Sequence, residues 1–142
     1  MRFWDSSALV PLIVGERATP WARKLLRSDP ASIVWALSEV EVRSALSRRM
    51  RERTLSRRTF DDARRRAERL FAALSHIVAL EHVSHRAMRL LDLHDLRAAD
   101  ALQLAAALVA SGERPQTVAF ATLDQRLATA ARAEGFPVDI TA

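Results

Sequence analysis

Short apolar segments alternate with longer amphipathic segments along the whole chain, and this alternation most constrains the fold. Five segments have the composition of strands: "RFWD" at 2–5, "SIVWAL" at 32–37, "HIVAL" at 76–80, "TVAFA" at 117–121 and "PVDI" at 137–140. Strands joined through helices need crossover connections, which favour parallel pairing and a sheet covered on both faces. The pattern therefore predicts a three-layer α/β/α sandwich with a mainly parallel central sheet and 137–140 at its edge.

Capping residues predict where the intervening helices begin and end. Helix starts are predicted at Ser6 or Ser7, at Thr19-Pro20, at Ser38 for a helix through Arg51, at Thr59 for a helix to Ser75, and at Ser84. Two further helices cover 96–111 and 123–134. Gly112 and Gly135 follow them and are suited to the left-handed backbone of a helix C-terminus.

The length and composition indicate one ordinary domain, which we assign to residues 1–142. The chain has no cysteine, so neither disulfides nor thiolate metal sites are available to it. Asp5 interrupts the N-terminus before any signal-like apolar run, and "ALVPLIV" and "ALQLAAALVA" are too short to cross a bilayer. We therefore expect a cytoplasmic protein with no membrane partner.

The formal net charge is +5, and the isoelectric point is near 11.2. Eleven arginines but only four acids fall between Arg43 and Arg69. Two interpretations fit this basic segment. In one, the arginines form a solvated helix face and pair with acids one turn away, such as Arg58 with Asp62. In the other, they face RNA.

One acidic residue stands in a segment that is otherwise suited to the protein core. From Ala98 to Ala110 the chain is apolar except for Asp100 and Gln103. A helix that is apolar on nearly every face belongs in a core, where an ionised carboxylate needs a compensating partner. Asp100 therefore either benefits from the positive end of the helix dipole or faces a cation.

Three further acids are expected at the same edge of the sheet as Asp100. Asp5 closes the first strand, Asp124 follows the fourth, and Glu41 lies in the first turn of the helix after 32–37. Ligands of open parallel sheets bind beyond the carboxyl ends of the strands. A cluster of carboxylates is stable there with a divalent ion, and oxygen-only ligands suit Mg²⁺ or Mn²⁺. The placement predicts a metal site.

Each acid also has a local explanation. Ser38 and Glu41 fit an S-x-x-E capping box. Asp124 and Asp100 stand where a helix dipole favours acids. Asp5 fits a turn after a strand. Spacing alone leaves both interpretations open.

Four segments in order resemble the PIN-domain ribonucleases of the VapC toxin type: "FWDSSALVPLI", "LSEVEVRSAL", "LRAADALQLAAAL" and "FATLDQRLATAARAEGFPV". The resemblance extends from Phe3 to Val138 and implies a PIN-like fold. It assigns Asp5, Glu41, Asp100 and Asp124 to the family's acidic quartet, as catalytic residues and metal ligands.

The same resemblance assigns Ser7 and Thr122 to hydroxyl positions that support the acids. Glu39 is the alternative second acid, although "EVRSAL" aligns Glu41 better. The chain departs from the family pattern at Arg126, where many relatives carry a further acid, and this departure bears on whether a second metal site is complete.

The resemblance implies a Mg²⁺- or Mn²⁺-dependent endoribonuclease that leaves 5′-phosphate and 3′-hydroxyl ends. It also implies a cognate antitoxin and a homodimer. The histidines are expected at the surface or at strand ends: His76, His82, His85 and His94. Two alternatives are an inactive PIN-fold binding module and a phosphoacceptor receiver-like domain. The receiver needs a lysine near the last strands, whereas Lys24 is the only lysine.

Two predicted helices carry apolar stripes at helical spacing. They consist of Trp21, Leu25 and Leu26 in one helix and Val42, Leu46 and Met50 in the other. An antitoxin peptide would fit a groove between these helices. In the alternative interpretation, the stripes pack inside the monomer or in a homodimer interface.

Overall fold

Five short parallel strands form a central sheet in the computed structural model, which describes residues 1–141. The strands are β1 (Arg2–Trp4), β2 (Ser32–Trp35), β3 (Ser75–Ile77), β4 (Ala119–Ala121) and β5 (Val138–Asp139). Their order is β3-β2-β1-β4-β5, so the last strand lies at an edge, as predicted. Residue 142 of the predicted domain lies outside the described residues.

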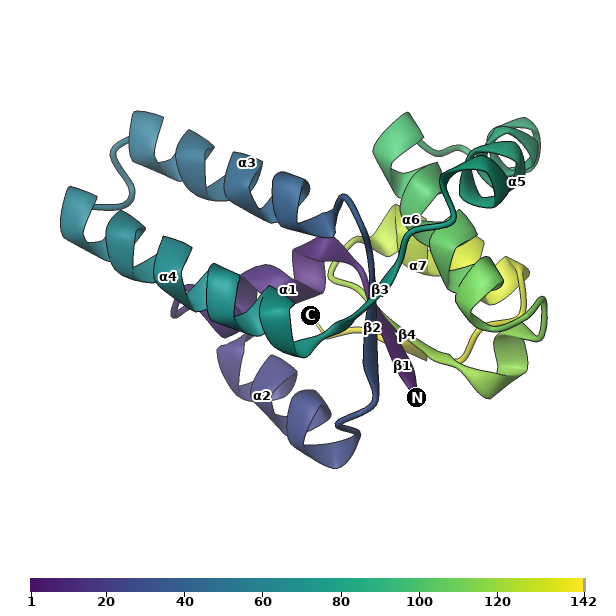
Figure 1. The fold of residues 1–142 in the computed structure, drawn as a ribbon, viewed down its shortest axis with the longest axis horizontal. Coiled ribbons are helices and arrows are strands. Elements are labelled where there is room, and N and C mark those ends of the chain that lie inside the picture. Colours follow the sequence, from purple (N-terminus) through teal and green to yellow (C-terminus); the bar gives the residue numbers. More distant parts are fainter. Residues whose placement is uncertain (142) are drawn as a thin grey trace.

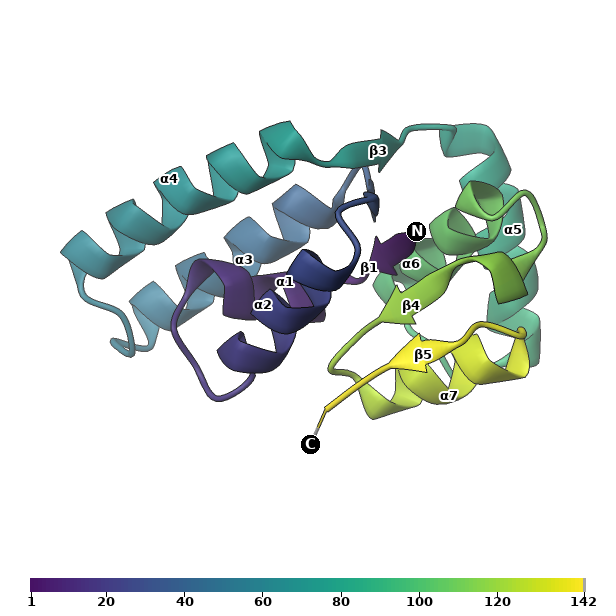
Figure 2. The same ribbon diagram turned by 90° about the horizontal axis from the view of Figure 1, so that it is seen from below.

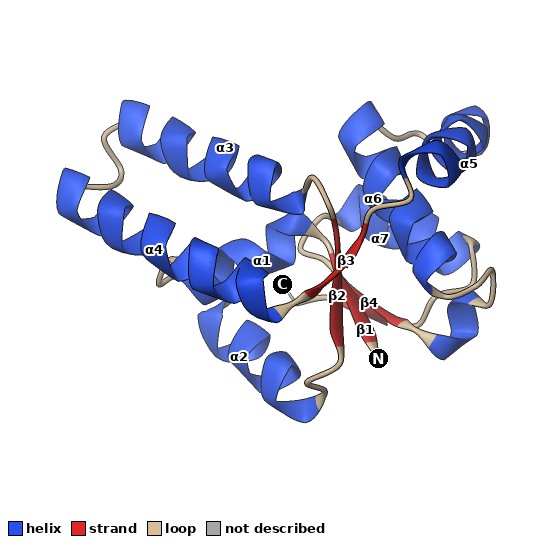
Figure 3. Ribbon diagram, in the orientation of Figure 1, coloured by secondary structure: helices blue, strands red, loops and turns tan. Residues whose placement is uncertain are grey.

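Seven α-helices cover the two faces of the sheet, as Figures 1 and 3 show. One face packs against α1 (Ser6–Ile13), α2 (Thr19–Ser28), α3 (Ser38–Arg51) and α4 (Arg57–Ala73). The other packs against α5 (Leu80–Leu93), α6 (Ala98–Ala110) and α7 (Gln125–Ala133). This arrangement confirms the predicted three-layer α/β/α sandwich. Among residues 1–141, no helix combines the length and the apolar character needed to cross a membrane.

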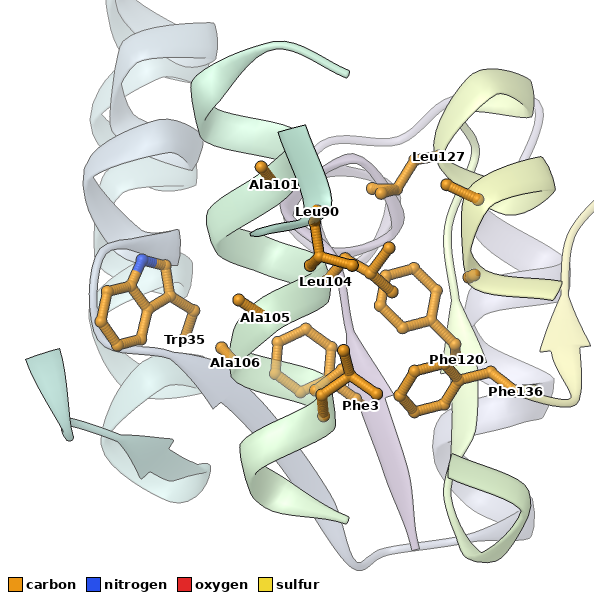
Figure 4. Packing of buried hydrophobic residues seen from close by; sticks show 14 of the residues in the cluster. Phe3, Trp35, Leu90, Ala101, Leu104, Ala105, Ala106, Phe120, Leu127 and Phe136 are labelled. Atoms are coloured by element: carbon orange, nitrogen blue, oxygen red, sulfur yellow. The ribbon is translucent and has the colours of Figure 1, made fainter. Parts of the chain in front are cut away.

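Successive residues of a strand point to opposite faces, which divides the core in two. Phe3 packs with the α5–α7 layer, whereas Trp4 packs with the α1–α4 layer. Phe3 also lies opposite Phe120 on β4, and their rings stack with centroids 5.6 Å apart. Figure 4 shows these aromatic rings beside Leu104 and Ala105 of α6.

The buried helix predicted from composition is α6. Seven of its thirteen residues are buried, Gln103 among them. The alanines at 105–107 allow the helix to pack closely against the sheet and against α5. Because α6 is fixed by this packing, its first turn holds Asp100 in a defined position.

Several helix boundaries differ from the predictions. α1 is capped by the side chain of Asp5 rather than by Ser6 or Ser7, and α4 by Ser56 rather than starting at Thr59. α5 begins at Leu80, so Ser84 lies inside it, and the segment 76–80 is a strand only in its first part. The helix ends followed by Gly112 and Gly135 are confirmed, with positive φ at both glycines.

The basic segment Arg43–Arg69 folds into the α3–α4 hairpin, which extends away from the sheet (Figure 2). Its ion pairs differ from the predicted ones. Arg65 pairs with Asp62, and Arg43 of α3 reaches Glu68 of α4 at 3.5 Å. These pairs involve partly exposed side chains and agree with a solvated surface.

The apolar stripes predicted to border a groove between α2 and α3 are mostly buried in the monomer. Val42 and Leu46 are completely buried in the core of the α1–α4 layer, and α1 packs against both helices. Trp21 and Leu25 are partly buried against the same core. All the stripe residues except Met50 therefore contribute to packing within the monomer, which is the alternative that sequence reasoning left open.

Candidate active site

The four predicted acids gather at the carboxyl ends of the central strands. Asp5 follows β1 and Asp124 lies two residues beyond Thr122, which follows β4. The strand order reverses between β1 and β4, and such a switch point is where open α/β sheets bind ligands. Glu41 and Asp100 reach this place from the first turns of α3 and α6.

Asp5 is held by hydroxyl groups from two sides. It is 3% exposed, and its Oδ2 accepts hydrogen bonds from the hydroxyl of Ser7 and from Thr122 Oγ1 at 2.9 Å. The backbone N–H of Ser7 adds a third bond at 3.2 Å and makes Asp5 the N-cap of α1. Within residues 1–141, only Ser6 approaches Oδ1, at 3.5 Å. Oδ2 is therefore saturated, and Oδ1 is the oxygen left to bind a ligand.

The two hydroxyls that support Asp5 also fix the loop after β4. Ser7 Oγ accepts the backbone N–H of Leu123 at 2.9 Å, and Thr122 Oγ1 accepts that of Asp124 at 3.0 Å. Each hydroxyl thus donates to Asp5 and accepts from the loop. This arrangement ties Asp124 to Asp5 and gives a physical reason for the predicted positions Ser7 and Thr122.

Glu41 is fixed by a buried polar network and does not form a capping box. Its Oε2 accepts from Ser6 Oγ at 2.8 Å, and its Oε1 accepts from Gln103 Nε2 at 3.1 Å. Ser38 contacts Gln103 at 3.0 Å and caps no backbone group. The network therefore directs Glu41 toward α1 and α6, and the capping interpretation of Glu41 is wrong.

Glu39, the alternative second acid, lies outside this network. Its side chain is 38% exposed and pairs with Arg43 at 3.9 Å. It is absent from the residues that line the acidic cleft. The structure brings Glu41, and not Glu39, to the other three acids.

Asp124 and Asp100 both have the local roles that sequence reasoning considered. Asp124 is the N-cap of α7, and its Oδ1 accepts the backbone N–H of Leu127 at 3.0 Å. Asp100 lies in the first turn of α6, where the dipole favours an acid. These roles coexist with their position at the cleft, because a carboxylate has a second oxygen to offer.

Burial and mutual repulsion raise the pKa of three of these carboxyls. Burial is the main cause for Asp5, and the charge of Asp100 adds to it against the hydrogen bonds from Ser7 and Thr122. Burial also raises the pKa of Glu41, with further contributions from Asp5 and Asp100. For Asp100, burial acts first and the charge of Asp124 second. Asp100 is thus coupled to each of the other acids.

These acids border an open cleft of about 730 Å³ between α1, α3 and the first turn of α6. Glu41, Asp100 and Asp124 line it together with Ser6 and Ser7, and Asp5 lies just beneath. None of the four histidines lines the cleft. The chemistry available here therefore belongs to carboxylates.

The donor set fits a divalent ion that keeps part of its water shell. No three acidic or histidine side chains of residues 1–141 lie close enough to form a complete metal cage. Mg²⁺ commonly binds through one or two carboxylates and completes its shell with water and substrate phosphate. Asp5 Oδ1 and the Asp100 carboxylate can provide that anchor, whereas both Glu41 oxygens already accept hydrogen bonds.

Two polar residues of the site were missed by sequence reasoning. Gln103 holds Glu41, and Ser6 links Glu41 to the segment that carries Asp5. The signal for Gln103 was present, because it is the second polar residue in an apolar helix and lies one turn after Asp100. Ser6 gave no such signal, because a serine after a strand also fits a helix cap.

A parallel sheet in this strand order, with carboxylates at its switch point, defines an α/β/α protein with an acidic site. The chain belongs to the PIN domain family, whose model matches residues 2–133. It is 35% identical over 133 residues to Ribonuclease VapC45 of Mycobacterium tuberculosis (strain CDC 1551 / Oshkosh), covering 94% of this chain and 90% of that protein. The resemblance found from the four sequence segments is confirmed.

Solved structures share the fold at lower identity. A toxin–antitoxin complex from Klebsiella pneumoniae is similar with a TM-score of 0.66 and 18% identity, over 98% of this chain and 96% of that one. Mycobacterium tuberculosis VapC20, described as a sarcin-ricin loop cleaving toxin, is similar with a TM-score of 0.65 and 22% identity, over 96% of both chains.

Proposed function

We propose that this chain is a toxin-type endoribonuclease that hydrolyses RNA phosphodiester bonds in the cytoplasm. The proposal rests chiefly on the gathering of Asp5, Glu41, Asp100 and Asp124 at one cleft, with Asp100 coupled to the other three. Membership of the PIN domain family and 35% identity to a protein named as a ribonuclease support it.

Our assignment of roles follows from the hydrogen bonds of each acid. Asp5 and Asp100 would hold Mg²⁺ or Mn²⁺, with Asp124 contributing the oxygen that does not cap α7. A bound ion of this kind lowers the pKa of a water molecule and stabilises charge on phosphoryl oxygens. Glu41 orients the attacking water, because Ser6 and Gln103 fix its carboxylate, and its raised pKa suits it to accept a proton.

The purified protein should cleave structured RNA with Mg²⁺ or Mn²⁺, and EDTA should stop the reaction. Asp5→Asn and Asp100→Asn should each lower the single-turnover rate by about 100-fold or more, because each removes charge from the reacting centre. Circular dichroism should show that both variants remain folded. Cleavage that continues in excess chelator would contradict the metal-dependent mechanism.

A catalytically inactive binding module is the second candidate. It is favoured by one observation: both oxygens of Glu41 and one oxygen of Asp124 already accept internal hydrogen bonds. Calorimetric titration with Mn²⁺ separates the two, since a module of this kind binds no ion at the cleft. The receiver-like alternative has no support, because Lys24 lies exposed on α2 and does not line the cleft.

We also propose that an antitoxin occupies the cleft. Val40, 64% exposed, lines the cleft beside Glu41, which suits a peptide with an apolar anchor followed by a basic side chain. Such a side chain would compete with metal at the acids. Co-expression with the product of the neighbouring small open reading frame should restore growth and yield a stable complex. A toxic chain that this product neither binds nor neutralises would contradict the pairing.

A further inference from the structure

A second hollow of about 600 Å³ lies directly beside the acids. It is lined by Arg97, Ala99, Asp100, Asp124, Gln125 and Arg126. Asp100 and Asp124 also line the acidic cleft, so the two hollows adjoin at these carboxylates. A polymer that crosses the acids toward the first turns of α6 and α7 therefore enters this hollow.

The two arginines of the hollow have little else to bind. Arg97 stands at the N-cap position of α6, makes no capping hydrogen bond through its side chain and pairs with no acid of residues 1–141 within 4.0 Å. Among the acids that the structure describes, Arg126 approaches only Asp95, at 3.9 Å, and the Asp95 side chain is 93% exposed. An exposed pair at this distance contributes little to stability. Both guanidinium groups are available to an anion.

Both arginines lie close enough to Asp100 to interact with it electrostatically. The charges of Arg97 and Arg126 lower the pKa of Asp100, against the larger effect of burial, so both lie within electrostatic reach of it. RNA carries one negative charge for each phosphate, and a site made of acids alone would repel it. Cations beside the acids offset that repulsion without displacing the carboxylates.

We infer that Arg97 and Arg126 bind a phosphate group of the RNA chain next to the phosphate that is cleaved at the acids. Guanidinium groups suit this task because they donate two parallel hydrogen bonds to phosphate oxygens. The inference rests on the proposed ribonuclease function and adds to it the direction in which the substrate leaves the acids, across α6 and α7.

The opposite end of the acidic cleft also carries a free cation. Arg48 lines the cleft about two helical turns beyond Glu41 on α3, and no acid in the described part of the chain pairs with it. α3 extends to one side of the sheet, whereas α6 and α7 lie on the other (Figure 1). The acids therefore lie between basic groups, as a strand bound across the site requires.

Binding is tested in the Asp5→Asn background, so that RNA is not consumed. Anisotropy of a labelled single-stranded RNA is measured with increasing salt for this protein and for the same protein with Arg97→Gln and Arg126→Gln. Each lost phosphate contact should make the plot of log affinity against log salt shallower by about 0.7. Because both arginines bind the same phosphate, the double change should reduce the slope by about 0.7.

The matched control carries Arg114→Gln and Arg132→Gln. Both arginines are exposed and line neither hollow, and their removal changes the net charge equally. The control should keep the original slope. In the catalytically competent chain, the Arg97 and Arg126 changes should raise KM about tenfold or more and leave kcat within about threefold, whereas the control should leave both unchanged.

The outcomes separate this inference from the proposed function. An unchanged slope and KM in a chain that still cleaves RNA would overturn the phosphate site and leave the ribonuclease intact. A fall in kcat with an unchanged slope would also overturn it, because the arginines would then act on the acids alone. Another outcome is a catalytically competent chain that fails to cleave RNA while the double variant still shows a reduced slope. That result would contradict the proposed ribonuclease function and support the phosphate site at Arg97 and Arg126.

Discussion

Asp100 is the residue through which the acidic site is electrostatically connected. The charge of Asp100 raises the pKa of Asp5 and of Glu41, and the charge of Asp124 raises the pKa of Asp100. Because these groups are buried or half-buried, the repulsion is screened less than on the open surface. The metal-free protein therefore carries unfavourable charge at neutral pH.

Asp100→Asn should stabilise the protein in metal-free buffer at pH 7. Asparagine keeps the shape of the side chain and removes the charge, and each kcal/mol of relieved repulsion raises Tm by about 3–5 °C in a chain of this size. Calorimetry or circular dichroism measures Tm. If the substitution lowers Tm, the helix dipole is the dominant influence on Asp100.

The pH dependence of stability has a defined sign. A carboxyl whose pKa is higher in the folded state than in the unfolded state binds more protons in the folded state. The free energy of unfolding therefore falls as pH rises from the ordinary pKa of the unfolded carboxyl through the raised pKa of the folded one. Three carboxyls of the site behave in this way. Asp100→Asn should make this fall smaller, and Mn²⁺ should reverse it in the wild type by binding the folded state.

Glu41→Gln should lower the cleavage rate by about 100-fold with little loss of stability. The amide still accepts a hydrogen bond, but it neither carries charge nor accepts a proton from water. Glu39→Gln is the matched control two residues earlier in α3, because Glu39 is exposed and, in the described part of the chain, forms an ion pair with Arg43 alone. Cleavage assays and Tm are measured for both. A strong loss at Glu39 with none at Glu41 would reverse their assignments.

Sequence reasoning located the acids of the site but not the groups that hold them. A carboxylate in an apolar helix or directly after a strand is conspicuous, which is why Asp5 and Asp100 were found. The support of Glu41 by Gln103 depends on how α3 and α6 pack together, across 62 residues of sequence. A local sequence pattern carries no information about residues so far apart, so Gln103 could not be identified from sequence as the partner of Glu41.

At the level of helices and strands, apolar alternation predicted the structure more accurately than capping residues did. The layers and the edge strand followed from apolar alternation, and they are confirmed. The start of α5 did not follow, because Leu80 begins the helix without a side-chain cap and Ser84 lies one turn inside. α5 is stabilised by the contacts of Val83, Ala87 and Leu90 with α6 and the sheet, and these tertiary contacts outweigh a local capping preference.

The α7 helix allows the capping and catalytic roles of Asp124 to be separated. Asparagine caps a helix as well as aspartate does, whereas alanine costs about 1 kcal/mol. Asp124→Asn should therefore keep Tm and lower the cleavage rate, and Asp124→Ala should lower both. If the wild type and Asp124→Asn cleave RNA equally well and only Asp124→Ala has a lower Tm, Asp124 caps α7 and has no role in cleavage.

At the scale of the whole molecule, the β3 edge of the sheet lies beside exposed apolar side chains. β3 is an edge strand with its outer side unpaired, and α5 follows it directly. Val78, Leu80, Met88 and Leu91 are 71%, 63%, 56% and 41% exposed there. The last three lie on one broad stripe of α5, because spacings of eight and three residues keep side chains on the same side of a helix. We propose that this stripe and edge contact a second copy in the homodimer that the family resemblance implies, because a twofold axis brings identical stripes together.

Leu80→Asp combined with Met88→Asp should convert the proposed homodimer into a monomer. Burying both apolar side chains against the partner contributes about 3–6 kcal/mol, so the dimer Kd should rise by about 100-fold or more. Sedimentation velocity over a range of concentrations measures the change. His82→Asp is the control, because His82 is exposed on the opposite side of α5. The double variant should keep its Tm at concentrations where the wild type is monomeric. A wild type that stays monomeric at all concentrations, or a double variant that dimerises equally well, would contradict the assignment.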